Sequence, residues 1–191
     1  MKRALFAAAA LLAAACQQEG GNASAPEGNG ATARTSPVAR GERPKTNILQ
    51  ALAGSADHKT LANAVRAAGL TQTLSGAQPY TLFAPTEAAF QKLPGGAGGL
   101  LAPEAKGQLV ALLTGHIVPG MVTAADLGRA IDRGKGKAQL ATVGGSNLSF
   151  SRDGDSILVT DAAGGQARII QADMLQSNGV VHSVDGVLKG R

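Results

Sequence analysis

The chain has 191 residues, a formal net charge of +5, 3% aromatic residues and no tryptophan. This length fits one ordinary domain with an additional segment. From Thr46 onward 12 basic side chains oppose 10 acidic ones, so the weak net charge of +2 and the scarcity of aromatic rings argue against a nucleic-acid-binding protein.

The first 16 residues, MKRALFAAAALLAAAC, have the layout of an export signal. Two basic residues precede an apolar run from Ala4 to Ala15, which is shorter than the about 20 residues that span a bilayer. Small residues come directly before Cys16, the only cysteine of the chain, and this ending resembles the lipobox of bacterial lipoproteins. We therefore predict that residues 1–16 are a lipoprotein signal peptide and that Cys16 is lipidated. An ordinary signal peptide cleaved nearby is the alternative.

Residues 17–45 are rich in Gly, Ala, Ser, Asn and Pro and contain almost no large apolar side chain. Such a segment cannot offset the entropy that ordering would cost, so we predict a disordered tether. Together with the lipid anchor, it predicts an extracytoplasmic protein of the cell envelope, either an outer-membrane lipoprotein, which Gln17 after the cysteine favours, or a protein that faces the periplasm.

Residues 46–191 are predicted to form a single domain in which helices come mostly first. Asn47 and Asp57 are each suited to cap a helix. The stretch TLFAPTEAAF, from Thr81 to Phe90, indicates a short apolar strand, a break at a proline and a new helix start. We expect both phenylalanines of this stretch, Phe83 and Phe90, to be buried.

Beyond about residue 137 the hydrophobic period changes from helical to two. The runs AQLATV, NLSFSR, SILVTD and ARIIQAD are separated by the dipeptides Gly144-Gly145, Asp153-Gly154 and Gly164-Gly165, which are typical of hairpin turns. Helices followed by an antiparallel meander predict the α+β class. The basic run RAIDRGKGK, from Arg129 to Lys137, is predicted to be a solvated loop, with an anionic polysaccharide or lipid headgroup as the alternative partner.

The three histidines do not form a predicted catalytic or metal site. We expect His58, at a helix start, to lie on the surface. Neither His116 nor His182 belongs to a paired ligand motif, so each is expected to satisfy a buried backbone group instead of binding a metal. Alternation along a strand would send His182 and Ser183 to opposite faces, which makes a catalytic triad there geometrically poor. We therefore predict no enzyme, no metal and no cofactor.

Three segments in a fixed order, TLFAPTEAAF (81–90), HIVPG (116–120) and NGVVHSVDGVL (178–188), resemble a fasciclin domain, and the resemblance extends from Asn47 to Leu188. It implies a wedge of antiparallel β-strands with several packed helices, used chiefly as an extracellular adhesion or interaction module. Glu87 stands where the family usually has Asn or Asp, and its longer side chain suits a bond to its own turn less well. The motif residues that we predict to be structural are Thr81, Phe83, Pro85, Thr86, Phe90, Asn178, Gly179, His182 and Asp185.

Vertebrate matrix members of this family use a Tyr-His pair and an Asp-Ile pair for integrin contacts. The counterparts here are Gly115-His116 and Asp173-Met174, so the tyrosine is missing and the isoleucine has changed. Integrin binding is therefore not expected, but the resemblance makes His116, Asp173 and Met174 candidates for an adhesive contact. We predict adhesion to an unknown protein or extracellular polymer. The alternative is a carrier of a small apolar ligand, either a lipid or a pigment.

Overall fold

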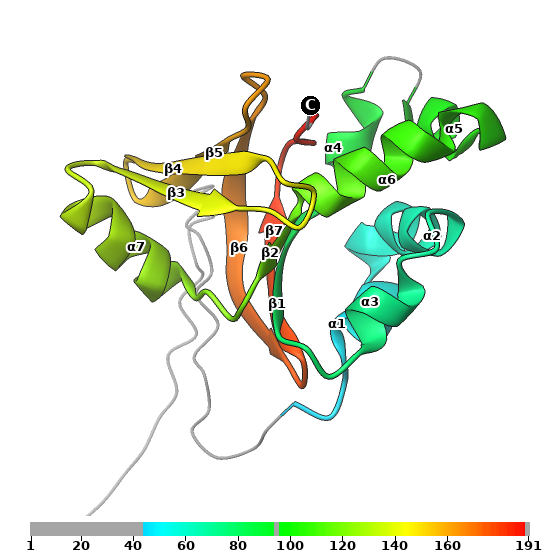
Figure 1. Ribbon diagram of the computed structural model, residues 1–191, viewed down its shortest axis with the longest axis horizontal. Coiled ribbons are helices and arrows are strands. Elements are labelled where there is room, and N and C mark those ends of the chain that lie inside the picture. Colours follow the sequence, from blue (N-terminus) through cyan, green and yellow to red (C-terminus); the bar gives the residue numbers. More distant parts are fainter. Residues whose placement is uncertain (1–43, 94–95, 190–191) are drawn as a thin grey trace, which may run out of the picture. The chain divides into compact units, whose positions relative to one another are not determined.

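A computed structural model describes residues 44–93 and 96–189 of the chain (Figure 1). The predicted signal peptide, Cys16 and nearly all of the predicted tether lie outside these residues. The helices come mostly first and the hairpins follow, as the sequence predicted. The helices are α1 (Ile48–Gly54), α2 (Lys59–Ala67), α3 (Thr71–Ser75), α4 (Glu87–Gln91), α5 (Gly96–Leu101), α6 (Lys106–Gly115) and α7 (Ala124–Arg133), with 3-10 turns at Ala56–His58 and Pro103–Ala105.

Seven strands form a sheet in the order β2-β1-β7-β6-β5-β4-β3. Strands β3 to β6 are joined by the predicted antiparallel hairpins, whereas β1 pairs with β7 in parallel, from Tyr80 opposite Gly179 to Pro85 opposite Val184. The sheet is therefore mixed, because β7 runs antiparallel to β6 and lies between β6 and β1. The strands are β1 (Tyr80–Pro85), β2 (Ile117–Pro119), β3 (Lys137–Ala141), β4 (Asn147–Asp153), β5 (Ser156–Thr160), β6 (Gln166–Gln176) and β7 (Gly179–Val184).

Capping explains where two of the helices begin. At α1, the Asn47 side chain accepts from the backbone N–H of Gln50 at 2.8 Å, and the Gln50 side chain accepts from the backbone N–H of Asn47 at 3.0 Å. Thr123 and Asp126 make the same reciprocal pair at α7. The predicted cap at Asp57 is wrong, because a 3-10 turn comes first and α2 begins after His58 without a side-chain bond from its N-cap residue.

The core consists of two apolar clusters on opposite faces of β1 and β7. Side-chain alternation sends Leu82 and Val181 toward α1, α2, α3 and α6, while Phe83 and Val184 face the hairpin strands and α7. Figure 1 shows this division, with α1 to α6 on one side of β1 and β7 and with α7, β3 and β4 on the other. Within the described part of the chain, none of the helices has the length and apolar character needed to cross a membrane.

Candidate functional site

The stretch from Thr81 to Phe90 is a structural corner. The Thr81 hydroxyl donates to the carbonyl of Gly120 and accepts from the N–H of Val122, both at 2.8 Å, so β1 is fastened to the chain that follows β2. Phe83 and Phe90 are 0% and 2% exposed, which confirms their predicted burial. The side chains of this stretch are therefore used inside the domain.

The turn between β6 and β7 fastens the first helices to the sheet. The Asn178 side chain accepts from the N–H of Ile48 at 2.9 Å and donates to the carbonyls of Leu74 and Gly76 at 2.8 and 2.9 Å. Gly179 follows at a place where a Cβ atom would lie 1.9 Å from the carbonyl oxygen of Tyr80. Both residues have structural roles, as the resemblance implied.

His116, a predicted adhesion candidate, is fully buried at the C-terminal end of α6. Its Nδ1 lies 2.8 Å from the carbonyl of Leu112, and its Nε2 accepts from the N–H of Leu188 at 3.1 Å. Burial lowers the pKa of His116 to about 4, so the ring is neutral at neutral pH. The side chain does not reach the surface, so it cannot touch a partner directly. This corrects the prediction that His116 is an adhesive contact.

His182 also bonds buried backbone groups, on the other face of the sheet. Its Nδ1 accepts from the N–H of Asp173 at 3.2 Å, and its Nε2 lies 2.9 Å from the carbonyl of Val122. The ring stacks on Phe83 with 5.4 Å between centroids. Desolvation by burial lowers the pKa of His182 despite the bond to Val122. His182 therefore holds two chain segments together, the one before α7 and the bulge of β6.

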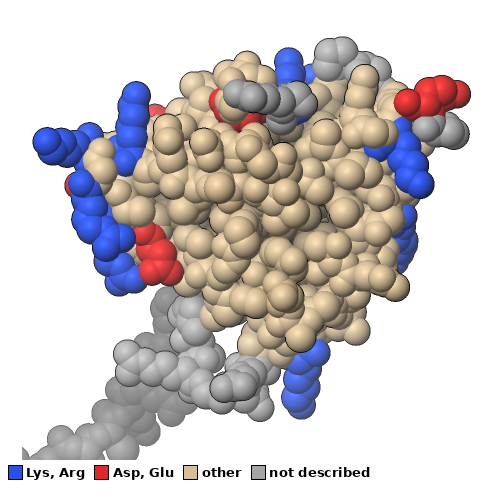
Figure 2. Space-filling model, in the orientation of Figure 1, with Lys and Arg blue, Asp and Glu red and all other residues tan. Residues whose placement is uncertain are grey.

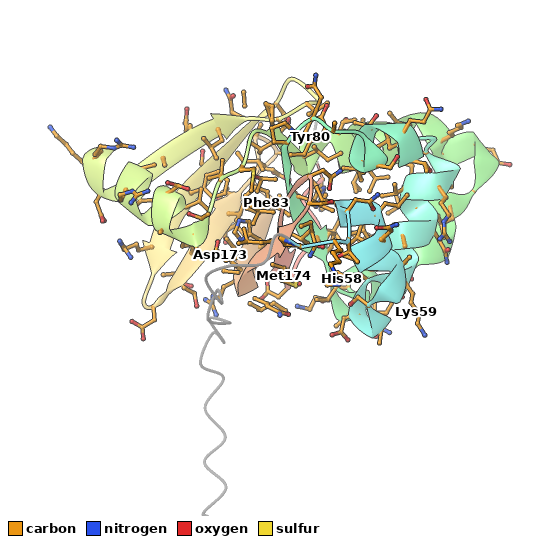
Figure 3. All side chains as sticks on the ribbon, turned by 90° about the horizontal axis from the view of Figure 1, so that it is seen from below. His58, Lys59, Tyr80, Phe83, Asp173 and Met174 are labelled. Carbon is orange, nitrogen blue, oxygen red and sulfur yellow. The ribbon has the colours of Figure 1, made fainter. Side chains whose placement is uncertain are left out.

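Asp173 and Met174 lie in an irregular part of β6, where the register with β7 shifts between Gln171 and Met174. Asp173 has a φ of 58° and accepts from the N–H of Ala124, the first residue of α7, at 2.7 Å. Met174 packs against the helix-side core cluster. Figure 3 shows the two neighbouring residues on either side of the strand, with Asp173 toward α7 and Met174 toward the first helices. Both are half-buried, so part of each side chain reaches the surface.

His58 was predicted to lie on the surface, but it is buried; Figure 3 shows it beside the first helices. Its ring lies between two hydroxyl groups, with Nδ1 2.9 Å from Ser55 Oγ and Nε2 3.0 Å from Ser183 Oγ. Desolvation by burial lowers its pKa, although the nearby charge of Asp57 opposes that shift. Ser183 is only 2% exposed, so this serine–histidine contact has no open face for a substrate. Ser183 and His182 do point to opposite faces of β7, as alternation predicted.

Glu87 forms an N-terminal cap on α2 from another helix. One carboxylate oxygen accepts from both the N–H and the hydroxyl of Thr60, the second residue of α2, with the N–H contact at 3.2 Å. The other oxygen is buried and has no hydrogen-bond partner among the described residues. The longer side chain of Glu87 thus reaches a neighbouring helix instead of its own turn.

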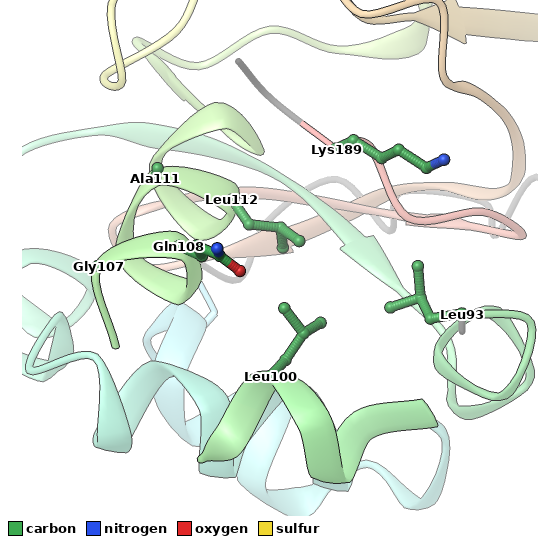
Figure 4. Close-up of a pocket in the computed structure, with 7 residues that line it drawn as sticks. All are labelled: Leu93, Leu100, Gly107, Gln108, Ala111, Leu112 and Lys189. Carbon is green, nitrogen blue, oxygen red and sulfur yellow. The ribbon is translucent and has the colours of Figure 1, made fainter. Parts of the chain in front are cut away.

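A hollow at the helical end of the domain was not foreseen from the sequence (Figure 4). It has a volume of about 580 Å³, and most of its wall is apolar. Polar groups come from one amide and one ammonium side chain. The lining residues are Leu93, Leu100, Gly107, Gln108, Ala111, Leu112 and Lys189.

Basic side chains gather at one edge of the molecule, where Figure 2 shows a group of Lys and Arg. Arg129, Arg133, Lys135 and Lys137 are all exposed, as predicted, but the run is not a loop, because Arg129–Arg133 belongs to α7 and Lys137 begins β3. Arg129 pairs with Asp126 at 2.5 Å.

Among residues 44–93 and 96–189, no three His, Cys, Asp or Glu side chains are grouped to hold a metal ion.

The fold and the motif contacts define an α+β domain in which the motif residues hold the strands and helices together. The model of the Fasciclin domain family matches residues 56–190, and the chain belongs to this family. Protein sll1483 of Synechocystis sp. is 39% identical over 142 residues, which cover 74% of this chain and 72% of that protein. Transforming growth factor-beta-induced protein ig-h3 of Sus scrofa is 30% identical over 146 residues, 76% of this chain but 20% of that protein.

A solved structure supports the same fold. The domain pair from the insect cell adhesion molecule Fasciclin I superimposes with a TM-score of 0.66 at 19% identity, over 76% of this chain and 51% of that one. This match confirms the predicted fasciclin-like α+β fold. Fasciclin domains thus occur in cell-adhesion proteins.

Proposed function

We propose that this protein is a non-enzymatic, extracytoplasmic interaction module that mediates adhesion to a protein or an extracellular polymer. One observation carries the proposal: both ring nitrogens of His58, His116 and His182 make hydrogen-bond contacts inside the domain. Side chains suited to acid–base chemistry are thereby used for structure. Recognition is then left to the outer surface, as in a family that includes a cell adhesion molecule.

The bulge of β6 offers the best-supported adhesive surface. His182 bonds both the carbonyl of Val122 and the N–H of Asp173, so the segment before α7 lies beside the bulge. Met121, just before Val122, is 52% exposed, the largest exposed fraction among the exposed large apolar side chains of the described residues. We define the bulge surface as Met121 and Asp173, an exposed apolar side chain and a carboxylate on the α7 side of β6; Met174 lies on the other side of the strand, against the helix-side core, and is not part of it.

An attachment assay with a deletion strain tests this surface. The strain is complemented with wild type, Met121→Ser or Asp173→Asn; Asn retains an oxygen acceptor for Ala124 and tolerates the positive φ of residue 173. We expect both variants to reduce attachment and biofilm formation at normal protein levels. Val143→Ser, which alters a 43% exposed residue elsewhere, is the matched control. If both bulge variants attach like the wild type, the bulge surface is not the adhesive surface. If the deletion strain attaches normally, the protein does not mediate adhesion under the conditions tested.

The same proposal includes a lipid anchor at Cys16 and a tether over residues 17–45. A flexible chain of this length has a root-mean-square reach of roughly 30 Å, enough to hold the domain clear of a membrane. We expect labelled palmitate to be incorporated into the wild type and not into Cys16→Ala, and globomycin to cause the precursor to accumulate. A wild-type protein without label would exclude the anchor while leaving the adhesive surface open to its own test.

A further inference from the structure

The hollow beside α6 has the dimensions and wall of a ligand pocket. Its volume of about 580 Å³ falls within the range of roughly 300 to 1,000 Å³ that is usual for small-molecule sites. Leu93, Leu100 and Leu112 point into the same space from the segment after α4, from α5 and from α6 (Figure 4). The wall is therefore apolar on several sides, as a hydrocarbon chain requires.

Gly107 keeps one side of this hollow open. It lies in the first turn of α6, and a Cβ atom built there would meet no other atom within 4 Å. Glycine lowers helix stability in such a place, and its backbone conformation does not require it, because its φ is not positive. Because a Cβ atom at residue 107 would lie in free space, we expect a larger side chain there to narrow the hollow with little change in the packing around α6.

Lys189 is held at the rim opposite Leu100 (Figure 4). The N–H of Lys189 donates to the Asp161 carboxylate at 2.6 Å, and the preceding Leu188 is buried and bonded to His116. His116 in turn contacts the carbonyl of Leu112, which lines the hollow. The backbone at residue 189 is thus fixed relative to the apolar wall, while the exposed ammonium group is free to meet an anion.

We propose that this hollow binds a free long-chain fatty acid, with the acyl chain between the three leucines and the carboxylate at Lys189. An apolar wall with one cation at its rim is complementary to a molecule with one hydrocarbon chain and one negative charge. The binding site lies apart from the bulge surface and adds a ligand to the adhesive role. It also gives the carrier alternative a specific location and a specific class of ligand.

A chain-length series provides the first test. Full-length protein carrying Cys16→Ala, which has no cysteine to acylate, is titrated with the fluorescent fatty acid cis-parinarate, which is then displaced by saturated acids of 8 to 18 carbons below their micelle concentrations. We expect one saturable site. Each added methylene should tighten binding about four-fold until the hollow is full. Absence of saturable binding, or affinity that does not depend on chain length, overturns the proposal.

Two variants test the geometry. Gly107→Leu should weaken binding roughly ten-fold or more because it fills space for several methylenes, whereas Gly54→Leu, at the end of α1 and also in open space, should not. Lys189→Glu should weaken dodecanoate roughly ten-fold and leave dodecanol unchanged, with Lys137→Glu on β3 as the matched control. Unchanged urea midpoints would show that the variants are folded.

The pattern of losses separates the possible ligands. Loss of dodecanoate binding in both Gly107→Leu and Lys189→Glu supports a fatty acid in this hollow. Equal affinity for dodecanol and dodecanoate, unaffected by Lys189→Glu, contradicts it and indicates a neutral apolar ligand. Full binding by Gly107→Leu also contradicts it, because the ligand must then bind elsewhere.

Discussion

The ring of His116 accepts a hydrogen bond from the backbone N–H of Leu188, and this 3.1 Å contact joins residues 72 positions apart. A backbone N–H can only donate, so Nε2 must be unprotonated and Nδ1 must carry the proton toward the carbonyl of Leu112. Protonation of Nε2 would remove the acceptor that fixes the end of the chain. The contact therefore makes the folded state sensitive to acid.

We expect the free energy of unfolding to fall as the pH drops from about 6.5 to about 4. In this range His116 becomes protonated in the unfolded chain but stays neutral in the folded protein, because burial lowers the pKa of His116 in the folded state to about 4. The difference from the ordinary value of 6.5 corresponds to about 3 kcal/mol. Urea unfolding at a series of pH values measures it, and the loss should be complete below pH 4.

The variant His116→Gln assigns this effect to the ring. It should be less stable than the wild type at pH 7 but should lose less stability on acidification. His58 and His182, whose pKa values burial also lowers, account for the slope that remains. An identical pH dependence in the two proteins would show that His116 is not the group responsible.

Local signals allowed much of the fold to be predicted. The predicted cap at Asn47 is correct because its side chain reaches a backbone N–H group only three residues away. The glycine pairs mark hairpin turns for an equally local reason. His116 and His182 were expected to bond backbone groups, and both do, because a histidine that lacks a ligand partner in a buried segment has few other ways to satisfy its nitrogens.

Contacts between distant segments could not be read in the same way. The parallel pairing of β1 with β7 depends on where the last strand returns, and no local pattern encodes it. His58 is buried because Ser183 comes to it from 125 residues away. The hollow could not be predicted for a related reason. One of its walls is α5, whose sequence GAGGLL contains three glycines that disfavour a helix. The rim of the hollow includes Lys189, which is distant from α5 in the sequence.

Gly179→Ala should destabilise the domain by about 3 kcal/mol or more. A Cβ atom at this position would lie 1.9 Å from the carbonyl oxygen of Tyr80, which the parallel pairing of β1 and β7 holds in place. Gly154→Ala is the matched control, because its φ of 59° strains the backbone but the space around it is open. We expect the control to cost about 1 to 2 kcal/mol in urea unfolding. Equal costs for the two variants would mean that close approach does not matter at Gly179.

Phe90→Ala should cost about 3 to 5 kcal/mol of unfolding free energy. Phe90 is 2% exposed within the helix-side core cluster, so its removal leaves a cavity beneath α4. Leu101→Ala, at a residue that is 36% exposed, provides a comparison at the surface. A cost below about 1 kcal/mol for Phe90→Ala in chemical denaturation would show that the corner does not belong to the core.

The cap that Glu87 provides to α2 should be measurable as a coupling energy. Glu87→Ala should cost about 1 to 3 kcal/mol, because it leaves the N–H of Thr60 without its acceptor and removes a negative charge from a helix N-terminus. Glu87→Gln retains an oxygen acceptor and should cost less. A double-mutant cycle of Thr60→Val with Glu87→Ala in urea unfolding should give about 0.5 kcal/mol or more, because Thr60→Val removes the hydroxyl bond to the same oxygen. Strict additivity would mean that this contact contributes nothing, and the start of α2 would then depend on packing alone.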